Sequence, residues 1–195
     1  HEGKTTTSTN LAVALAQDLH KNILLADCDL RKPNVHNLLG LRMEGGMSDI
    51  LMRGAELDAV FKKTRIENLT DITSGRIPSN PAELLGSHRM RELLVEFKNR
   101  FDYVILDTPP ILAITDTSIL GTFVDGVIVV IQAWRTQREP LARAKSLLSN
   151  VQANVIGYIL TNVEHFVPGY LSNYGYHYGY GQYSGYYAHS ESEEV

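Results

Sequence analysis

Short apolar runs alternate with longer stretches of helical periodicity along most of the chain. The apolar runs are rich in β-branched residues and cover 23–26, 103–106, 126–131 and 155–161, and we interpret 69–73 as a further strand. Continuous runs of this kind are typical of parallel strands that are covered on both faces. Helical periodicity occupies 10–19, 81–97, 115–120 and 140–148. The alternation predicts a doubly wound α/β domain, with a mostly parallel sheet and helices on both faces.

One helix carries a readable start signal. Asn80 is placed to cap this helix, and Glu83 follows three residues after the cap. Pro81 stands at the first helical position, where its missing N–H removes no hydrogen bond from the helix. The pattern predicts a single structural helix over 81–97.

From Phe166 the aliphatic residues give way to tyrosine, glycine and serine. A segment of this composition is expected to form a flexible tail. We therefore divide the chain into a domain over 1–165 and a tail over 166–195. The tail holds eight of the ten tyrosines, namely Tyr170, Tyr174, Tyr176, Tyr178, Tyr180, Tyr183, Tyr186 and Tyr187.

Length and composition limit the classes of function. A chain of 195 residues with 44% hydrophobic residues suits one domain with a sizeable core. The net charge of −4 gives no basic surface, so nucleic acid is not an expected partner. The single cysteine, Cys28, excludes an internal disulfide framework, and we interpret it as a small core residue.

The first candidate chemistry lies at the start of the chain, in Gly3, Lys4, Thr5 and Thr6. This is the end of a phosphate-binding loop: glycine allows close backbone approach, lysine neutralises phosphate charge and the hydroxyl of Thr5 can hold Mg²⁺. A helix beginning at about Thr5 would add its free amides and dipole. The strand that normally feeds such a loop is expected upstream of Gly3, in a longer natural protein.

Three aspartates follow predicted strands. Asp27 and Asp29 lie two residues apart, so the period of a strand places both on one side, and Asp107 ends another strand. Because ligands bind beyond the carboxyl ends of such strands, the three carboxylates are expected beside Lys4 and Thr5. Mg²⁺ takes one or two carboxylates with phosphate oxygens, which leaves one carboxylate to act as a base.

Other polar residues have more ordinary interpretations. Asp116 begins a predicted helix, and we interpret it as a cap; Arg31 and Lys32 are interpreted as solvated loop charges. Asn162 follows the last strand and either contacts a nucleotide base or ends the strand.

Four stretches together resemble the bacterial tyrosine kinases (BY-kinases) of polysaccharide export, and the tyrosine-rich end strengthens the resemblance. They are Glu2-Gly-Lys-Thr-Thr6, Leu25-Ala-Asp-Cys-Asp-Leu-Arg-Lys-Pro33, Ser74-Gly-Arg-Ile-Pro-Ser-Asn-Pro-Ala-Glu-Leu-Leu85 and Asp102-Tyr-Val-Ile-Leu-Asp-Thr-Pro-Pro110. By this resemblance Gly3, Lys4 and Thr5 match the Walker A loop, Asp27 and Asp29 the Walker A′ motif, and Asp107 the Walker B motif. His1 stands where the family usually has glycine.

The resemblance implies an ATP- and Mg²⁺-dependent kinase that phosphorylates its own tail between subunits of a ring. It also implies a membrane-spanning adaptor, fused or separate, control of capsule or exopolysaccharide synthesis, and a position on the cytoplasmic side of the inner membrane.

In that reaction Lys4 would neutralise the phosphoryl group, and Asp27 or Asp29 would take the proton of the tyrosine hydroxyl. Thr5 and Asp107 lie on the metal side, with Asp29 as a further metal candidate; Gly3, Thr6 and Asn162 would contact the nucleotide.

Two alternatives remain open at this stage. One is a ParA/MinD-type positioning ATPase, against which the glycine- and tyrosine-rich tail argues. The other is a non-catalytic nucleotide-binding scaffold whose tail self-associates.

Overall fold

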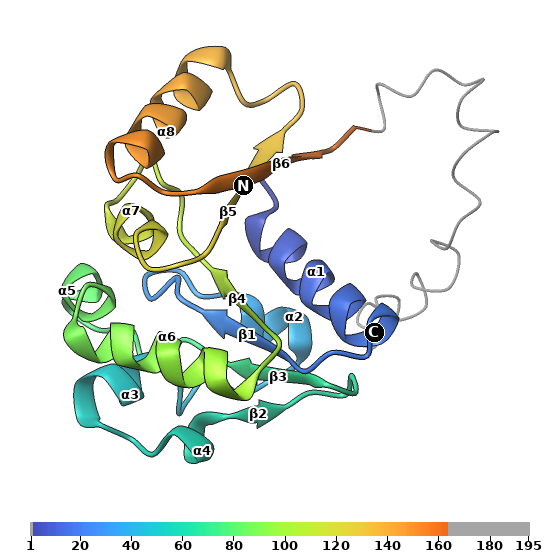
Figure 1. The fold of residues 1–195 in the computed structure, drawn as a ribbon, viewed down its shortest axis with the longest axis vertical. Coiled ribbons are helices and arrows are strands. Elements are labelled where there is room, and N and C mark those ends of the chain that lie inside the picture. Colours follow the sequence, from blue (N-terminus) through green and yellow to red (C-terminus); the bar gives the residue numbers. More distant parts are fainter. Residues whose placement is uncertain (1, 164–195) are drawn as a thin grey trace, which may run out of the picture. The chain divides into compact units, whose positions relative to one another are not determined.

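The computed structural model describes residues 2–163, and its first compact unit comprises His1–Thr161. Within this unit, strands and helices alternate as the hydrophobic pattern predicts (Figure 1). The strands are β1 (Ile23–Asp27), β2 (Lys62–Lys63), β3 (Leu69–Ile72), β4 (Tyr103–Asp107), β5 (Val127–Gln132) and β6 (Val155–Thr161). The helices are α1 (Lys4–Asp18), α2 (Val35–Leu39), α3 (Met47–Arg53), α4 (Leu57–Val60), α5 (Pro81–Leu85), α6 (His88–Arg100), α7 (Asp116–Gly121) and α8 (Arg138–Asn150).

Hydrophobic side chains gather on both faces of β1, which confirms the doubly wound arrangement. On one face, Ile23 and Leu25 pack with Ala12 and Ala16 of α1. On the other face, Leu24 and Ala26 belong to a larger cluster that α3, α4, α5, α6 and α7 help to build. All five residues of β1 are fully buried because the strand has a partner on each edge and helices over each face.

The strands form two sheets rather than one. The first has the order β2-β3-β1-β4, and the second pairs β5 with β6. All pairings among the described strands are parallel except the short β2 with β3. Among these strands, β4 and β5 each have one edge without a strand partner.

The predicted helix over 81–97 is two helices. α5 ends at Leu85, and Gly86 and Ser87 separate it from α6. The physical reason is a new cap, because the Ser87 side chain accepts a hydrogen bond from the Met90 N–H at 3.1 Å and starts α6 afresh. The apolar stripe of α6, at 90, 93, 94 and 97, then faces the core.

The cap predicted at the start of α5 is also different. Asn80 occupies the N-cap position, but its side chain accepts no hydrogen bond from the helix backbone. Its amide instead donates to Glu83 Oε2 at 2.7 Å, so the two polar side chains bind each other. Pro81 does stand in the first turn, as predicted.

Candidate nucleotide-binding site

The N-terminus of α1 provides a place for an anion. Gly3 precedes the helix with φ of +84°, a left-handed conformation that favours glycine. With no side chain at Gly3 to cap the helix, the amides of the first turn, from Lys4 to Thr6, have no partner within the helix. Exposed amides and the helix dipole at one end suit phosphate oxygens.

Lys4 extends beside this helix end. Its ammonium group donates a hydrogen bond to Glu2 Oε2 at 2.6 Å, and its side chain is one quarter exposed. The same contact lowers the pKa of the Glu2 carboxyl. The Lys4 ammonium group is thus paired with the Glu2 carboxylate beside the first turn of α1.

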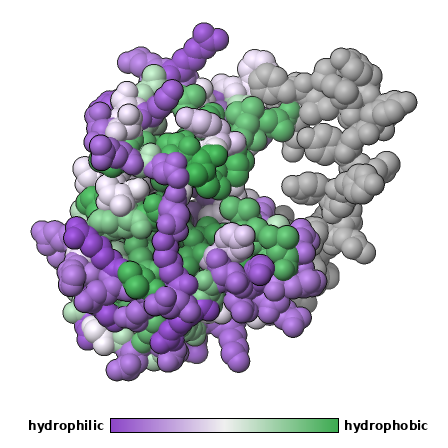
Figure 2. All heavy atoms as spheres, viewed as in Figure 1, coloured by the Kyte–Doolittle hydropathy of each residue, from purple (hydrophilic) through white to green (hydrophobic). Residues whose placement is uncertain are grey.

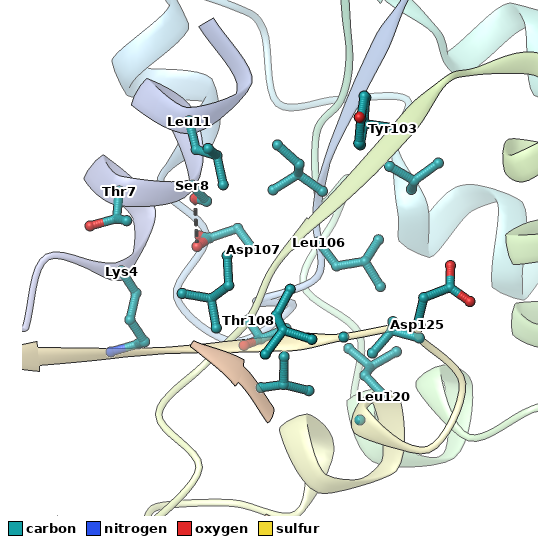
Figure 3. A pocket seen from close by; sticks show the side chains of 18 of the residues that line it. Lys4, Thr7, Ser8, Leu11, Tyr103, Leu106, Asp107, Thr108, Leu120 and Asp125 are labelled. Atoms are coloured by element: carbon teal, nitrogen blue, oxygen red, sulfur yellow. Dashed lines mark hydrogen bonds between the residues drawn. The ribbon is translucent and has the colours of Figure 1, made fainter. Parts of the chain in front are cut away.

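Thr5 and Asp107 come together as the sequence predicts. The Thr5 hydroxyl donates to Asp107 Oδ2 at 2.8 Å. The Ser8 hydroxyl donates to Asp107 Oδ1 at 2.9 Å, and Figure 3 shows this second contact. Asp107 is 2% exposed, and burial raises the pKa of its carboxyl while the two hydroxyls lower it. Ser8 was missed at the sequence level, although its position three residues after Thr5 puts it on the same helix face.

Asp27 lies beside Asp107 on neighbouring strands, at the same register position. Asp27 is fully buried, and its two oxygens accept backbone N–H groups of Asp29, Asn34 and Val35 at 3.1–3.2 Å. Burial, followed by the negative charge of Asp107, raises the pKa of Asp27 to about 7. Asp27 therefore organises the loop that follows β1 as well as facing the site.

Asp29 is less enclosed than Asp27. Its Oδ1 accepts the backbone N–H groups of Arg31 and Lys32 at 3.2 and 2.9 Å, and its residue is partly exposed. The loop thus presents the Asp29 carboxylate at the surface of the site. Cys28, between the two aspartates, is fully buried in the hydrophobic cluster, which confirms its interpretation as a core residue.

Asp116 is not a helix cap. Thr115 occupies the cap position, and Asp116 is fully buried as the first residue of α7. Its carboxylate accepts two hydrogen bonds from the Arg31 guanidinium, at 2.9 and 3.2 Å. Arg31 is exposed, as predicted, but it is not a free loop charge: its side chain ties the loop after β1 to α7, because a buried carboxylate needs a cationic partner.

Asp71 is a further buried carboxylate, and the sequence analysis did not single it out. It lies in β3 opposite Leu25 of β1, is fully buried, and neither oxygen has a hydrogen-bond partner. Burial, followed by the charge of Asp27, raises the pKa of Asp71 to about 8, and Lys62 lowers it.

The remaining predicted residues fall at or beyond the end of the described chain. Asn162 directly follows β6 in a left-handed conformation, with φ of +59°. His1 and all eight tail tyrosines lie outside residues 2–163. In the part of the chain that the structure describes, no helix is long and apolar enough to cross a membrane.

The site fits a nucleotide with its magnesium ion. Within residues 2–163, no three His, Cys, Asp or Glu side chains are placed to bind a metal by themselves. Mg²⁺ bound with nucleotide takes few protein ligands, because phosphate oxygens and water complete its octahedron. The Thr5 hydroxyl and the Asp107 carboxylate provide such a small set beside the phosphate-binding helix end.

The fold and this site together define a P-loop nucleotide-binding protein. A family model described as an AAA domain matches residues 2–157. The chain is 43% identical over 159 residues to the tyrosine-protein kinase YwqD of Bacillus subtilis, a match that covers 82% of this chain and 67% of YwqD.

Solved structures agree with this family. The kinase domain of the Escherichia coli tyrosine kinase ETK superposes with a TM-score of 0.79 at 34% identity, covering 82% of this chain and 62% of that one. The cell division ATPase MinD of Pyrococcus furiosus superposes with a TM-score of 0.68 at 22% identity, covering 82% and 66%, which shows the fold alone.

The chain belongs to the family of bacterial tyrosine-protein kinases. It spans only about a quarter of the tyrosine-protein kinase wzc of Salmonella typhi, to which it is 40% identical over 176 residues.

Proposed function

We propose that the chain is the catalytic part of an ATP-dependent protein-tyrosine kinase that phosphorylates tyrosines 170–187 of its own tail. The supporting observation is the contact of Thr5 and Ser8 with Asp107 at the open end of α1, where Lys4 also lies. A phosphate-binding helix end, a cation and strand-end carboxylates then share one edge of the sheet. Phosphoryl transfer needs mainly such positioning and charge stabilisation.

In this proposal each residue has a defined role. Gly3 and the amides through Thr6 bind phosphate oxygens, Lys4 neutralises the transferred group, and Asn162 contacts the base. Thr5 and Asp107 hold Mg²⁺, with Asp29 as a further candidate ligand; the ion shields phosphate charge when bound. The tyrosine oxygen bonds to the γ-phosphorus, the bond to the leaving ADP breaks, and a carboxylate takes the hydroxyl proton.

Asp27 and Asp29 are the two candidates for that base. The hydroxyl of an incoming tyrosine can approach Asp29 more readily, because Asp29 is partly exposed whereas Asp27 is fully buried. A tyrosine hydroxyl has a pKa of about 10, so removal of its proton by a positioned base accelerates transfer.

The names of the relatives support a proposal for the biological role of this chain. Several curated relatives are tyrosine-protein kinases, and two are named CapB and CpsD. We propose that this chain acts in a homo-oligomeric ring, with tails phosphorylated between subunits, together with a membrane-spanning adaptor that is fused or separate. Its place would be the cytoplasmic side of the inner membrane, in control of capsule or exopolysaccharide synthesis.

Mass spectrometry of the full natural protein tests the function directly. After incubation with Mg²⁺ and ATP, the intact mass should show a series of added phosphates, and peptide mapping should place them on Tyr170 through Tyr187. Production of ADP without added mass would instead support a positioning ATPase. Nucleotide binding with neither product would support a non-catalytic scaffold.

Asparagine variants separate the two candidate bases. Asp29→Asn should lower the phosphorylation rate by roughly 10²–10⁴-fold with an unchanged unfolding temperature, since a lost general base costs about that much. Asp27→Asn should also destabilise the fold, because its amide NH₂ cannot accept the backbone N–H groups that Asp27 binds.

Asp18→Asn, an exposed change at the end of α1, is the matched control. A wild-type rate for Asp29→Asn would remove that residue from the role of base.

A further inference from the structure

Arg31 lies between two carboxylates that have different surroundings. Its Nε donates to Asp116 Oδ2 at 2.9 Å, and its Nη2 donates to Asp116 Oδ1 at 3.2 Å. The backbone N–H of the same residue donates to Asp29 Oδ1 at 3.2 Å. Arg31 therefore joins a carboxylate of the candidate site to a carboxylate that lies 85 positions further along the chain.

The contact with Asp116 differs from an ordinary surface ion pair. The Asp116 side chain is fully buried, whereas the Arg31 side chain is 40% exposed. Two N–H groups of the planar guanidinium bind the two carboxylate oxygens, which is the strongest geometry for such a pair. A buried carboxylate that loses its cation is strongly unfavourable, so Arg31 binds Asp116 in preference to a more solvated carboxylate.

Helix α7 holds Asp116 in a fixed position. The Thr117 hydroxyl donates to the Pro109 carbonyl oxygen at 2.6 Å, which attaches α7 to the segment after β4, and Leu120 is 2% exposed in the hydrophobic core. Figure 1 shows α7 between α5 and α8. Figure 2 shows hydrophobic residues gathered in the middle of the same view, with hydrophilic side chains around them. The packed domain therefore sets the place of Asp116.

The Asp29 carboxylate is the alternative partner of the Arg31 guanidinium. The hydrogen bond with Asp116, and more weakly the charge of Asp29, raise the pKa of Arg31. Because the Arg31 N–H already contacts Asp29, the long side chain of Arg31 is able to fold back onto this carboxylate when no stronger partner holds it. Such a pair would cover oxygens that a magnesium ion or a tyrosine hydroxyl has to reach.

We propose that Asp116 is a positioning residue that holds the Arg31 guanidinium away from Asp29 and so keeps the Asp29 carboxylate open. This inference rests on the role proposed above for Asp29 as base or metal ligand. Asp116 acts through Arg31 and contacts neither nucleotide nor tyrosine. The N–H groups of Arg31 and Lys32 bind Asp29 Oδ1, and an ionised carboxylate accepts about four hydrogen bonds, so Asp29 keeps room for a further ligand.

Two neutral variants separate this role from a merely structural one. Asp116→Asn keeps the shape of the side chain but removes the charge that holds Arg31. In the full natural protein, kcat for tail phosphorylation should then fall by about tenfold or more, a part of the roughly 10²–10⁴-fold that a general base provides. The double variant Arg31→Gln/Asp116→Asn also removes the released cation, and it should recover most of the lost rate.

Recovery in the double variant is the decisive result. Rates are compared at a temperature at which the unfolding curves show all variants to be folded. A double variant as slow as Asp116→Asn would overturn the proposal, because two structural losses do not cancel. A wild-type rate for Asp116→Asn would overturn it as well. Asp125→Asn, which breaks the exposed ion pair with Lys98, is the matched control and should keep the wild-type rate.

Proton exchange at Arg31 Nε tests the arrangement without any measurement of kinase activity. Nitrogen-15 NMR of the nucleotide-free protein follows the exchange of this proton with water. In the wild type, Asp29→Asn should leave the exchange rate unchanged, because Nε donates to Asp116. In the Asp116→Asn protein, Asp29→Asn should accelerate the exchange, because Asp29 is then the partner of Arg31.

The NMR experiment also distinguishes failure of this inference from failure of the proposed function. An equal effect of Asp29→Asn in the two backgrounds would overturn the inference, whatever the kinase activity. A wild-type protein that gives the expected exchange pattern but no phosphorylation would refute the kinase function and still support the release of Arg31 onto Asp29.

Discussion

Lys4→Met is expected to lower the rate of tail phosphorylation by roughly 10²–10³-fold, the usual cost of losing one preorganised group that stabilises transition-state charge. The lysine lies at the open end of α1, and its only described ion-pair partner is Glu2 in the same loop. The substitution removes a positive charge from the place where phosphate charge must be neutralised. The rate is measured by the appearance of phosphorylated tail peptides at saturating Mg²⁺ and ATP.

Folding should be little affected by the same change. Lys4 and Glu2 are partly exposed, so water can still reach the Glu2 carboxylate when the Lys4 ammonium group is removed. Lys145→Met, on the exposed side of α8, is a matched control and should leave both rate and stability unchanged. Phosphorylation of the Lys4→Met protein at the wild-type rate would refute the assigned role of Lys4.

Asp71→Val is expected to stabilise the protein by about 1–3 kcal/mol near pH 4, where only the usual cost of a buried polar group without a partner is relieved. Both oxygens of Asp71 lack hydrogen bonds, and valine is a good strand residue of similar shape. Lys62 keeps hydrogen-bond partners when Asp71 is replaced, because its ammonium group donates to the backbone carbonyls of Glu44 and Gly45. The measurement is the free energy of unfolding in denaturant.

The stabilisation by Asp71→Val should grow as the pH rises. The folded pKa of Asp71 is about 8, above its ordinary value of 3.8, so between these values the folded state holds a proton that the unfolded state has lost. Wild-type stability should therefore decrease from pH 4 to pH 8, by up to about 1.4 kcal/mol per pH unit from this group.

Asp71→Asn is the matched control for ionisation. It keeps the shape of the side chain and an unpartnered polar group but cannot ionise, so it should remove this part of the pH dependence with less stabilisation than valine. Asp27 and Asp107 are present in all three proteins, so the differences between the curves report Asp71 together with its interaction with Asp27. A constant difference between wild type and Asp71→Val from pH 5 to pH 9 would contradict the raised pKa.

Local patterns along the chain were sufficient to predict most of the fold and the meeting of Thr5 with Asp107. Continuous apolar runs predicted β1, β4, β5 and β6, because a strand covered on both faces is apolar at most positions, and the segment 69–73 was predicted separately as the further strand that became β3. The candidate site residues Gly3, Lys4, Thr5 and Asp107 were also chosen from local patterns. Their residue types and their places at the ends of strands and helices are consequences of short-range geometry.

Long-range partners had to come from the tertiary structure. The sequence could not show that Arg31 binds Asp116, 85 positions later, so one was interpreted as a solvated charge and the other as a cap. It could not show that Asp71 is buried without a partner, or that Ser8 shares Asp107 with Thr5. The residue type does not tell whether a polar side chain is hydrated, forms an ion pair or is buried without a partner, because this depends on which distant residues surround it.

The division of the strands into two sheets was also decided by long-range contacts. An apolar run predicts a strand, but the partner on each edge depends on which distant segments reach it, and this decided that β4 and β5 border an open cleft. The sequence by itself determined the elements and the kinds of chemical group at their ends. Only the tertiary structure decided which groups meet, because burial and pairing are properties of the assembled chain.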